Sequence, residues 1–216
     1  MTRQDFLLDH YPSVASGACQ GEPVEFTHPP ATAAWLHQDS RQGFEVAFFR
    51  VTDAGRRIDG YAAVSEDGDA FAVEYDIELD TTWRTRTARV HGRSPSGSRT
   101  VLLESDGSGH WAVDGERAPY LDGCFDVDLE ASAMTNALPV RRMALPHGTE
   151  ASAPAAWVRA LDLTVERLEQ TYTRTTDRGT HTCYDYRAPA SGFSSRIVYD
   201  ESGLPLEYPG IAVRAG

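Results

Sequence analysis

One stretch of the chain, residues 70–80, alternates apolar and acidic side chains with a strict period of two. The apolar members are Phe71, Val73, Tyr75, Ile77 and Leu79, and the acidic members are Glu74, Asp76, Glu78 and Asp80. Successive side chains of a β-strand point to opposite faces, so this pattern predicts a strand with one face on a core and the other in water. The chain therefore has to build a sheet around it.

Other short runs of the same kind follow one another from Trp35 onward, separated by turn signals. They cover Glu45–Val51, Arg57–Val64, Trp83–Val90, Thr100–Glu104, Trp111–Val113, Cys124–Leu129, Val140–Ala144, His181–Arg187 and Ser194–Tyr199. The turn signals are Asp53-Ala-Gly55, Glu66-Asp-Gly68, Asp106-Gly107, Asp114-Gly115 and Ser202-Gly203. Many short strands joined by tight turns predict a sandwich, a barrel or a curled half-barrel.

The segment Trp157–Gln170 has no single period. Trp157, Leu161 and Leu168 fit one helix face, whereas Leu161, Leu163 and Val165 alternate as in a strand. Short apolar runs do not distinguish the two.

The first 31 residues differ in composition from the rest. They contain Pro12, Pro23, Pro29 and Pro30 and show no sustained period, which predicts a flexible or loosely docked extension over 1–31. The remaining residues, 32–216, are expected to form one domain, since an all-β fold of this length is commonly a single unit.

The chain is acidic, with a net charge of −12, and all of its basic residues are arginine. This balance argues against nucleic acid and anionic membrane surfaces as partners. The cysteines are Cys19, Cys124 and Cys183, an odd set without a CxxC pair, which predicts reduced thiols. With neither an export signal near the N-terminus nor a membrane-spanning run, we expect a cytoplasmic protein that does not insert into membranes.

Recognisable catalytic and cofactor motifs are missing. No serine has the G-x-S-x-G frame, and the seven histidines show no metal-ligand spacing. The Gly107-Ser-Gly109 run lacks the rest of a phosphate-binding loop. The sequence therefore predicts no metal and no cofactor.

Asp126 and Asp128 form the most distinctive acidic pair, because alternation places both on the face opposite Val127 and Leu129. One interpretation is a site for a hard cation, but the local sequence shows no further oxygen ligands. The alternative, which we favour, is that both accept hydrogen bonds from backbone N–H groups or from arginine.

Several runs, in this order, resemble the bacterial putative glycolipid-binding family. They are Asp80-Thr-Thr-Trp83-Arg84-Thr85-Arg86, Asp106-Gly-Ser-Gly109-His-Trp111, Leu121-Asp-Gly-Cys-Phe-Asp-Val-Asp-Leu129, Thr135-Asn136-Ala-Leu138-Pro139-Val140-Arg141-Arg142, Gln170-Thr-Tyr172-Thr173 and Gly203-Leu-Pro-Leu-Glu-Tyr208-Pro209-Gly210. The likeness extends from about Trp35 to Val213. It implies a mostly β protein in which a curled antiparallel sheet forms an incomplete barrel, with few or no helices. It also implies strand structure over Trp157–Gln170.

The matched residues provide the candidate ligand-binding set. These are Trp83, Arg84, Arg86, Asp126, Asp128, Asn136, Arg141, Arg142 and Tyr208. Aromatic side chains can hold an apolar tail or stack on a sugar, although they also suit a β core. The two arginine pairs could clamp an anionic head group, or could instead neutralise the acidic strands. Asn136 is expected to form a turn in which its own side chain bonds the backbone.

Two functions from different classes remain open. The first is a binding protein that holds an amphipathic, lipid-like or glycolipid-like molecule in an open β cavity. The second is a small β-barrel enzyme of secondary metabolism, a cyclase or an isomerase, that works by positioning its substrate beside one acid or base. We favour the binding protein, with the arginine face of the strand at Arg84 and Arg86 lining the concave side.

Overall fold

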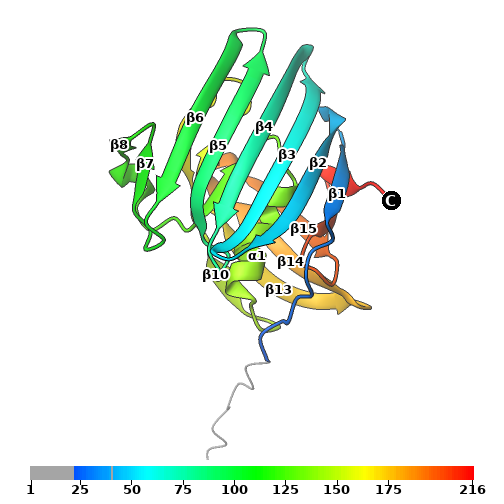
Figure 1. Cartoon of the computed structure of the whole chain (residues 1–216). Coiled ribbons are helices and arrows are strands. Elements are labelled where there is room, and N and C mark those ends of the chain that lie inside the picture. The colour runs from blue at the N-terminus through cyan, green and yellow to red at the C-terminus, as the bar shows by residue number, and fades with distance from the viewer. Residues whose placement is uncertain (1–21, 40) are drawn as a thin grey trace, which may run out of the picture.

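A computed structural model describes residues 22–39 and 41–216 of the chain. Most of these residues belong to one 14-stranded antiparallel sheet (Figure 1). Its first half comprises β1 (Thr32–His37), β2 (Arg41–Thr52), β3 (Gly55–Glu66), β4 (Asp69–Leu79), β5 (Thr85–Ser94), β6 (Gly97–Ser105), β7 (Trp111–Val113) and β8 (Glu116–Arg117). Its second half comprises β10 (Glu150–Ser152), β13 (Thr171–Arg178), β14 (His181–Ala188), β15 (Phe193–Tyr199), β16 (Pro205–Tyr208) and β17 (Ala212–Arg214).

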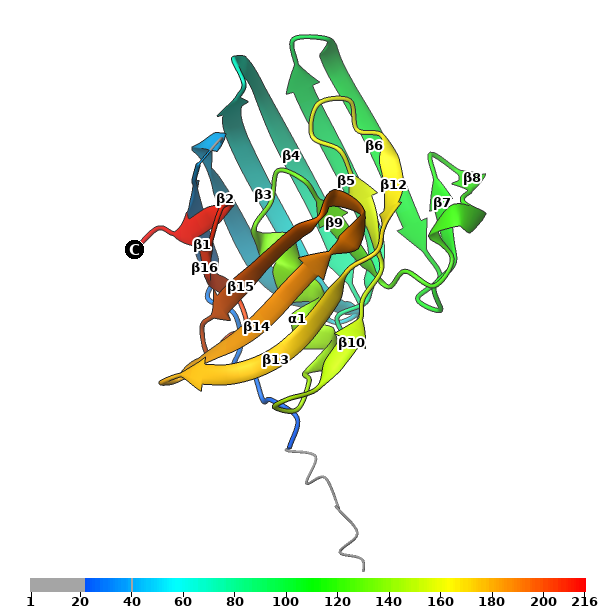
Figure 2. The same cartoon turned by 180° about the vertical axis from the view of Figure 1, so that it is seen from behind.

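The sheet curls without closing into a barrel. Strand β1 pairs with β17, which joins the two halves, while the end strands β10 and β8 have no pairing with each other. The β2–β6 wall and the β13–β15 wall therefore face one another (Figures 1 and 2). This confirms the predicted incomplete barrel.

A second, three-stranded sheet and one short helix lie between the two walls (Figures 1 and 2). The small sheet is formed by β9 (Asp126–Leu129), β11 (Ala155–Val158) and β12 (Val165–Leu168). Strand β11 pairs antiparallel with β12 and parallel with β9. Helix α1 (Ala137–Met143) follows the 3-10 helix η2 (Met134–Asn136), and two further 3-10 turns are η1 (Pro119–Leu121) and η3 (Pro189–Ser191).

Strand β4 confirms the alternation that predicted the sheet. Its apolar side chains from Phe71 to Leu79 are all buried, whereas Glu74 and Glu78 are exposed. The turns at Asp53–Gly55, Glu66–Gly68 and Asp114–Gly115 connect neighbouring strands as expected. These features depend on the order of neighbouring residues in the chain, so they can be recognised from the sequence without a structure.

The segment after Asn136 was predicted wrongly. The prediction of a strand over Val140–Ala144 fails because Ala137–Met143 forms α1. Pro139 lies in its first turn, where the missing N–H leaves no helical hydrogen bond unmade. Ala137, Leu138 and Val140 are buried, and Ala144 ends the helix in a left-handed conformation with φ 44°. A pattern of so few residues does not separate strand from helix.

Two further local expectations change. Trp83 is not part of a strand, because it has a φ of 69° and lies in the turn before β5, which begins at Thr85. Strand alternation between Trp83 and Arg84 therefore does not apply. In the segment Trp157–Gln170 the strand interpretation is confirmed, because β11 and β12 form a hairpin in which Leu163 has a φ of 55°.

The predicted extension 1–31 lies mostly outside the described residues. Within residues 22–31, Phe26 packs against the Arg141 guanidinium at 5.6 Å, and the Thr27 N–H donates to the Glu201 carbonyl at 2.9 Å. The division of the chain at residue 31 stays a prediction.

Glu45, on β2, is fully buried and links the sheet to the segment before α1. Its Oε1 accepts hydrogen bonds from the Tyr75 hydroxyl at 2.6 Å and from the Ser132 hydroxyl. Its Oε2 accepts from the backbone N–H groups of Ala133 at 2.8 Å and Met134 at 3.3 Å. Burial raises the pKa of Glu45, and these four hydrogen bonds act in the opposite direction. The contacts fix the segment that carries Asn136.

Gly60, on β3, provides the space for this arrangement. An ideal Cβ at Gly60 would lie 2.1 Å from Cζ of Tyr75, so only glycine lets the Tyr75 ring cross this strand. The hydroxyl of that ring then reaches Glu45.

Cys124 and Cys183 are both free and buried, whereas Cys19 lies outside the described residues. Burial raises the pKa of Cys124 to about 11, which suppresses its thiolate at neutral pH. We expect both described thiols to react slowly with Ellman's reagent in native protein and rapidly in denaturant. Time-resolved thiol counting checks this, and rapid native modification of Cys124 would contradict the buried position.

Candidate ligand-binding site

A pocket of about 620 Å³ opens inside the curl, between the small sheet and strands β14–β16. Its wall mixes aromatic, apolar and charged side chains. The lining residues are Arg41, Glu66, Asp128, Leu129, Glu130, Ser132, Asn136, Trp157, Arg159, Glu166, Leu168, Tyr186, Ala188, Ala190, Ser191, Phe193, Tyr208, Gly210 and Ile211. Such mixed walls with a few convergent polar groups are typical of small-molecule sites.

Three aromatic rings form one wall of the pocket. The ring centroids of Tyr186 and Phe193 are 6.0 Å apart, those of Tyr186 and Tyr208 are 6.0 Å apart, and those of Phe193 and Tyr208 are 6.1 Å apart. All three rings meet at tilted or edge-on angles, as aromatic clusters prefer. Trp157, from β11, adds a fourth ring to the lining.

Asp128 is the buried acid of the pocket. It lies on β9 with 8% of its surface exposed, and among the described residues its side chain has one hydrogen-bond partner, the Thr135 hydroxyl, which donates to Oδ1 at 3.5 Å. Burial raises the pKa of Asp128 to about 7, with a smaller contribution from the nearby carboxylates of Asp126 and Glu130. At neutral pH this carboxyl can therefore exchange a proton, which suits an acid or base in a site.

Asn136 contributes a second polar group to the pocket. Its Oδ1 accepts a hydrogen bond from the Tyr172 hydroxyl at 2.9 Å, and its carbonyl accepts from the Tyr199 hydroxyl at 3.3 Å. The predicted turn, with the side chain bonding the local backbone, is wrong: Asn136 belongs to η2 and its side chain bonds a distant strand. Within the described residues its amide NH₂ has no protein acceptor, so it can donate to a ligand.

Ion pairs occupy the charged edge of the pocket. Arg41 contacts Glu66 at 2.9 Å and Glu130 at 3.3 Å, and Arg159 contacts Glu130 at 3.1 Å and Glu166 at 3.9 Å. Arg159 also lies over the Trp157 ring at 4.3 Å. Both guanidinium groups are thus committed to carboxylates and are poor candidates for capturing an anion.

The predicted ligand-binding residues separate into two groups. Asp128, Asn136 and Tyr208 meet in the pocket, although their elements are far apart in the sequence. The others do not line it: Trp83, Arg84, Arg86, Asp126, Arg141 and Arg142. The favoured hypothesis that Arg84 and Arg86 line the concave side therefore has no counterpart in this pocket, whose arginines are Arg41 and Arg159.

The predicted arginine pairs are engaged elsewhere. Arg142 makes a bidentate ion pair with Asp126, at 3.0 Å from Nε and 2.6 Å from Nη2. Arg141 lies over the Trp83 ring at 3.9 Å and donates to the Ser202 carbonyl. Both guanidinium groups therefore already have protein partners.

Arg84 and Arg86 likewise lie near the turn after β6. Arg84 donates to the Gly107 carbonyl at 2.8 Å, and its guanidinium lies 4.7 Å from the Phe125 ring. Arg86 lies against Gly107 as well, where an ideal Cβ would meet its Nη1 at 2.1 Å. The turn thus holds the arginine pair that was expected to meet an anionic head group.

The two acids on β9 behave differently, contrary to the expectation of a common role. Asp126 accepts from an arginine, as favoured, but Asp128 accepts from neither an arginine nor a backbone N–H among the described residues. All four residues of β9 are buried, so the neighbours of each acid decide its environment. Helix α1 brings Arg142 to Asp126, whereas tyrosines of β13–β16 lie near Asp128.

Several pocket residues had no sequence signal. Arg41, Glu130, Arg159 and Phe193 belong to no motif, and only the folded chain brings them together. Tyr186 is one of 21 aromatic residues in the chain, and no motif sets it apart from the others. A single sequence does not distinguish a pocket tyrosine from a core tyrosine.

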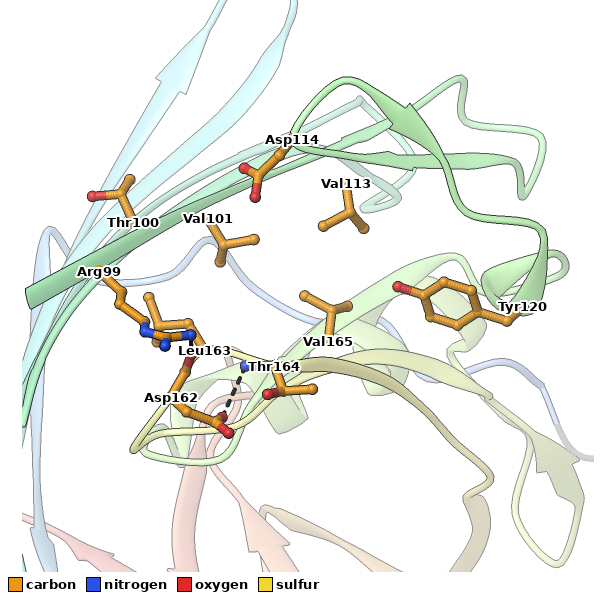
Figure 3. Close-up of a pocket in the computed structure, with 10 residues that line it drawn as sticks. All are labelled: Arg99, Thr100, Val101, Val113, Asp114, Tyr120, Asp162, Leu163, Thr164 and Val165. Atoms are coloured by element: carbon orange, nitrogen blue, oxygen red, sulfur yellow. Dashed lines mark hydrogen bonds between the residues drawn. The ribbon is translucent and has the colours of Figure 1, made fainter. Parts of the chain in front are cut away.

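A second pocket, of about 530 Å³, lies on the outer rim between β6, β7 and the β11–β12 turn (Figure 3). Its acids serve the local backbone: Asp114 accepts from the Leu102 N–H at 2.9 Å, and Asp162 accepts from the Thr164 N–H at 2.9 Å. Tyr120 is about half exposed there. With its carboxylates already used in turns, this pocket is the weaker candidate.

Within residues 22–39 and 41–216, no group of three or more histidine, cysteine, aspartate or glutamate side chains is arranged to hold a metal ion. In the same part of the chain, no helix has the length and hydropathy needed to cross a membrane.

Residues 32–214 match the model of a protein family described as putative glycolipid-binding. The chain belongs to this family. Among solved structures, a DUF1089 family protein from Pseudomonas aeruginosa is 33% identical, with a TM-score of 0.68 over 84% of this chain and 95% of that one. The resemblance inferred from the sequence motifs is thereby confirmed.

A more distant structural neighbour shares the fold alone. It is a β-barrel-like protein with a DUF1849 domain from Brucella abortus, 11% identical, with a TM-score of 0.51 over 88% of this chain and 96% of that one. A comparison with curated proteins finds no significant match.

Proposed function

We propose that this protein binds an amphipathic small molecule in the pocket between the small sheet and strands β14–β16. The observation that supports this most is the meeting of an aromatic wall, formed by Tyr186, Phe193 and Tyr208, with the polar groups of Asp128 and Asn136. The rings would contact the apolar part of the ligand, and the two polar side chains would hold its polar end. The family description points to the same ligand class.

Blocking the pocket mouth tests this proposal. Ala190 is exposed and lines the pocket, so Ala190→Trp fills the entrance without removing core atoms. We expect this variant to lower the affinity for a fluorescent fatty-acyl probe at least about tenfold, since drug-sized ligands bury most of their surface in such sites. Fluorescence titration measures the change.

The matched control is Thr100→Trp, which adds the same side chain at an exposed residue of the rim pocket (Figure 3). It should bind the probe like the unmodified protein. An equal loss in both variants, or none in Ala190→Trp, would contradict binding in the inner pocket. If the wild-type protein takes up no acyl or glycolipid probe at tens of micromolar, the proposed binding function is wrong.

A second candidate function is catalysis by a cyclase or isomerase, and the observation that favours it is Asp128. A carboxyl with a pKa near 7 inside an aromatic pocket is suited to moving a proton at neutral pH. Mass spectrometry of a bound molecule before and after incubation separates the two functions. A carrier returns its ligand unchanged, whereas an enzyme converts it and loses that conversion in Asp128→Asn.

A further inference from the structure

Asp128 is a buried carboxyl without a counter-charge. It is more than nine-tenths buried, lines the pocket and leaves Oδ2 without a hydrogen bond among the described residues. An ionised carboxylate in such a place is costly unless a cation or several donors approach it. The unliganded protein thus holds an acceptor that the fold itself does not satisfy.

The groups that face Asp128 from the surrounding elements include no cation. They are Asp126 and Glu130 beside it in the chain, Thr135 of η2, Trp157 of β11, and the phenols of Tyr172, Tyr186, Tyr199 and Tyr208. Arg142 is paired with Asp126, and Arg41 and Arg159 are paired with glutamates. A cation at Asp128 would therefore have to come from outside the protein.

The rest of the pocket suits a positive charge. Four carboxylates line it, those of Glu66, Asp128, Glu130 and Glu166, against the two guanidinium groups of Arg41 and Arg159. The faces of aromatic rings also attract cations, most strongly where water is excluded. Tyr186, Tyr208 and Trp157 offer such rings in the same pocket.

We propose that the polar end of the ligand is a protonated amine that pairs with Asp128. The inference rests on the proposed function, since it assigns the head group of the amphipathic molecule. The amine donates to the free carboxylate oxygen and is surrounded by the aromatic wall, while the apolar tail extends toward Phe193 and Ile211. An anionic head group would instead meet an excess of negative charge.

Matched ten-carbon ligands test the head group. Decylamine, decanol and decanoate are titrated into the full chain by calorimetry at pH 8, below their aggregation concentrations. We expect decylamine to bind at least about tenfold more tightly than the other two, because a charge-assisted hydrogen bond is stronger than one between neutral groups. Equal affinities for all three would overturn the amine assignment but leave the proposed function intact, whereas no binding by any of them would remove both.

Two variants of equal charge sharpen the test. Asp128→Asn keeps the shape of the side chain and should lower decylamine affinity at least about tenfold while leaving decanol unchanged. Glu74→Gln removes one negative charge from the exposed face of β4 and should change neither affinity. A similar loss in both variants would mean that the amine is attracted only by the overall negative charge of the protein, and would overturn the pairing.

The number of protons released on ligand binding provides a further test, because it would not depend on Asp128 if this residue had only a structural role. At pH 6 the Asp128 carboxyl is largely protonated, so a bound ammonium group should expel close to one proton per ligand. Calorimetry in buffers of different ionisation enthalpy measures this number. The release should vanish in Asp128→Asn, and decylamine binding to the unmodified protein without proton release would overturn the proposal.

Discussion

Asp128→Asn is expected to stabilise the unliganded protein at pH 8, by up to about 4 kcal/mol. The pKa of Asp128 is raised from 3.8 to about 7 in the folded state. Each unit of this difference corresponds to about 1.4 kcal/mol. The folded protein retains the proton at pH values where the unfolded chain has lost it, so the contribution is full below about pH 4 and is lost as the pH rises through 7. Asparagine mimics the neutral form and avoids this loss.

Chemical denaturation of the two proteins at several pH values measures the effect. The difference in the free energy of unfolding should grow between about pH 4 and pH 7 and stay constant above about pH 8. Glu78→Gln, on the exposed face of β4, serves as a control in which the difference should remain small at every pH. An Asp128→Asn variant that is less stable at pH 8 would mean that the carboxylate has stabilising partners.

Higher stability of Asp128→Asn at pH 8 would also support a functional role for Asp128. A side chain that lowers the stability of the empty protein at neutral pH is typical of a site in which binding or chemistry, and not folding, requires the group. Addition of a ligand that satisfies Asp128 should then recover stability in the unmodified protein but not in Asp128→Asn.

Glu45→Ala is expected to lower the free energy of unfolding by at least about 3 kcal/mol. The change removes the acceptor of four hydrogen bonds, those from Tyr75, Ser132, Ala133 and Met134, at a fully buried position. Each buried donor left without a partner costs about 1–3 kcal/mol. The cavity left by the side chain adds to the loss.

A graded series isolates the cause. Tyr75→Phe removes only one donor and should cost about 1 kcal/mol. Glu74→Gln, next to Tyr75 in β4 but on the exposed face of that strand, should be close to neutral. Urea denaturation provides these values. A Glu45→Ala variant of nearly unchanged stability would show that the segment before α1 is not held by Glu45.

The fold was largely predictable because its signals are local. The alternation over residues 70–80 and the Asp-Gly turns depend only on neighbours in the chain, and they identified the long antiparallel strands β2–β6. The family motifs then indicated the incomplete barrel. Where the local signal was short, as at Ala137–Met143, burial of the first turn of α1 between the two walls decided the structure.

The pocket was predictable only in part. The sequence motifs singled out Asp128, Asn136 and Tyr208, which meet there. They equally singled out Arg84 and Arg142, which the fold uses at Gly107 and Asp126. Motifs report which residue types matter and do not distinguish a side chain that binds a ligand from one that binds the protein.

The sequence by itself determined the strands, the turns and the acidic character of the chain, since these follow from spacing and composition. Only the tertiary structure decided which acid has a partner. Asp126 and Asp128 are two residues apart on the same strand, yet α1 brings Arg142 to the first, whereas β11 and β13–β16 surround the second with Trp157 and four tyrosines. The charge state of a buried carboxyl depends on what lies across it in space, and elements far away in the chain supply those neighbours.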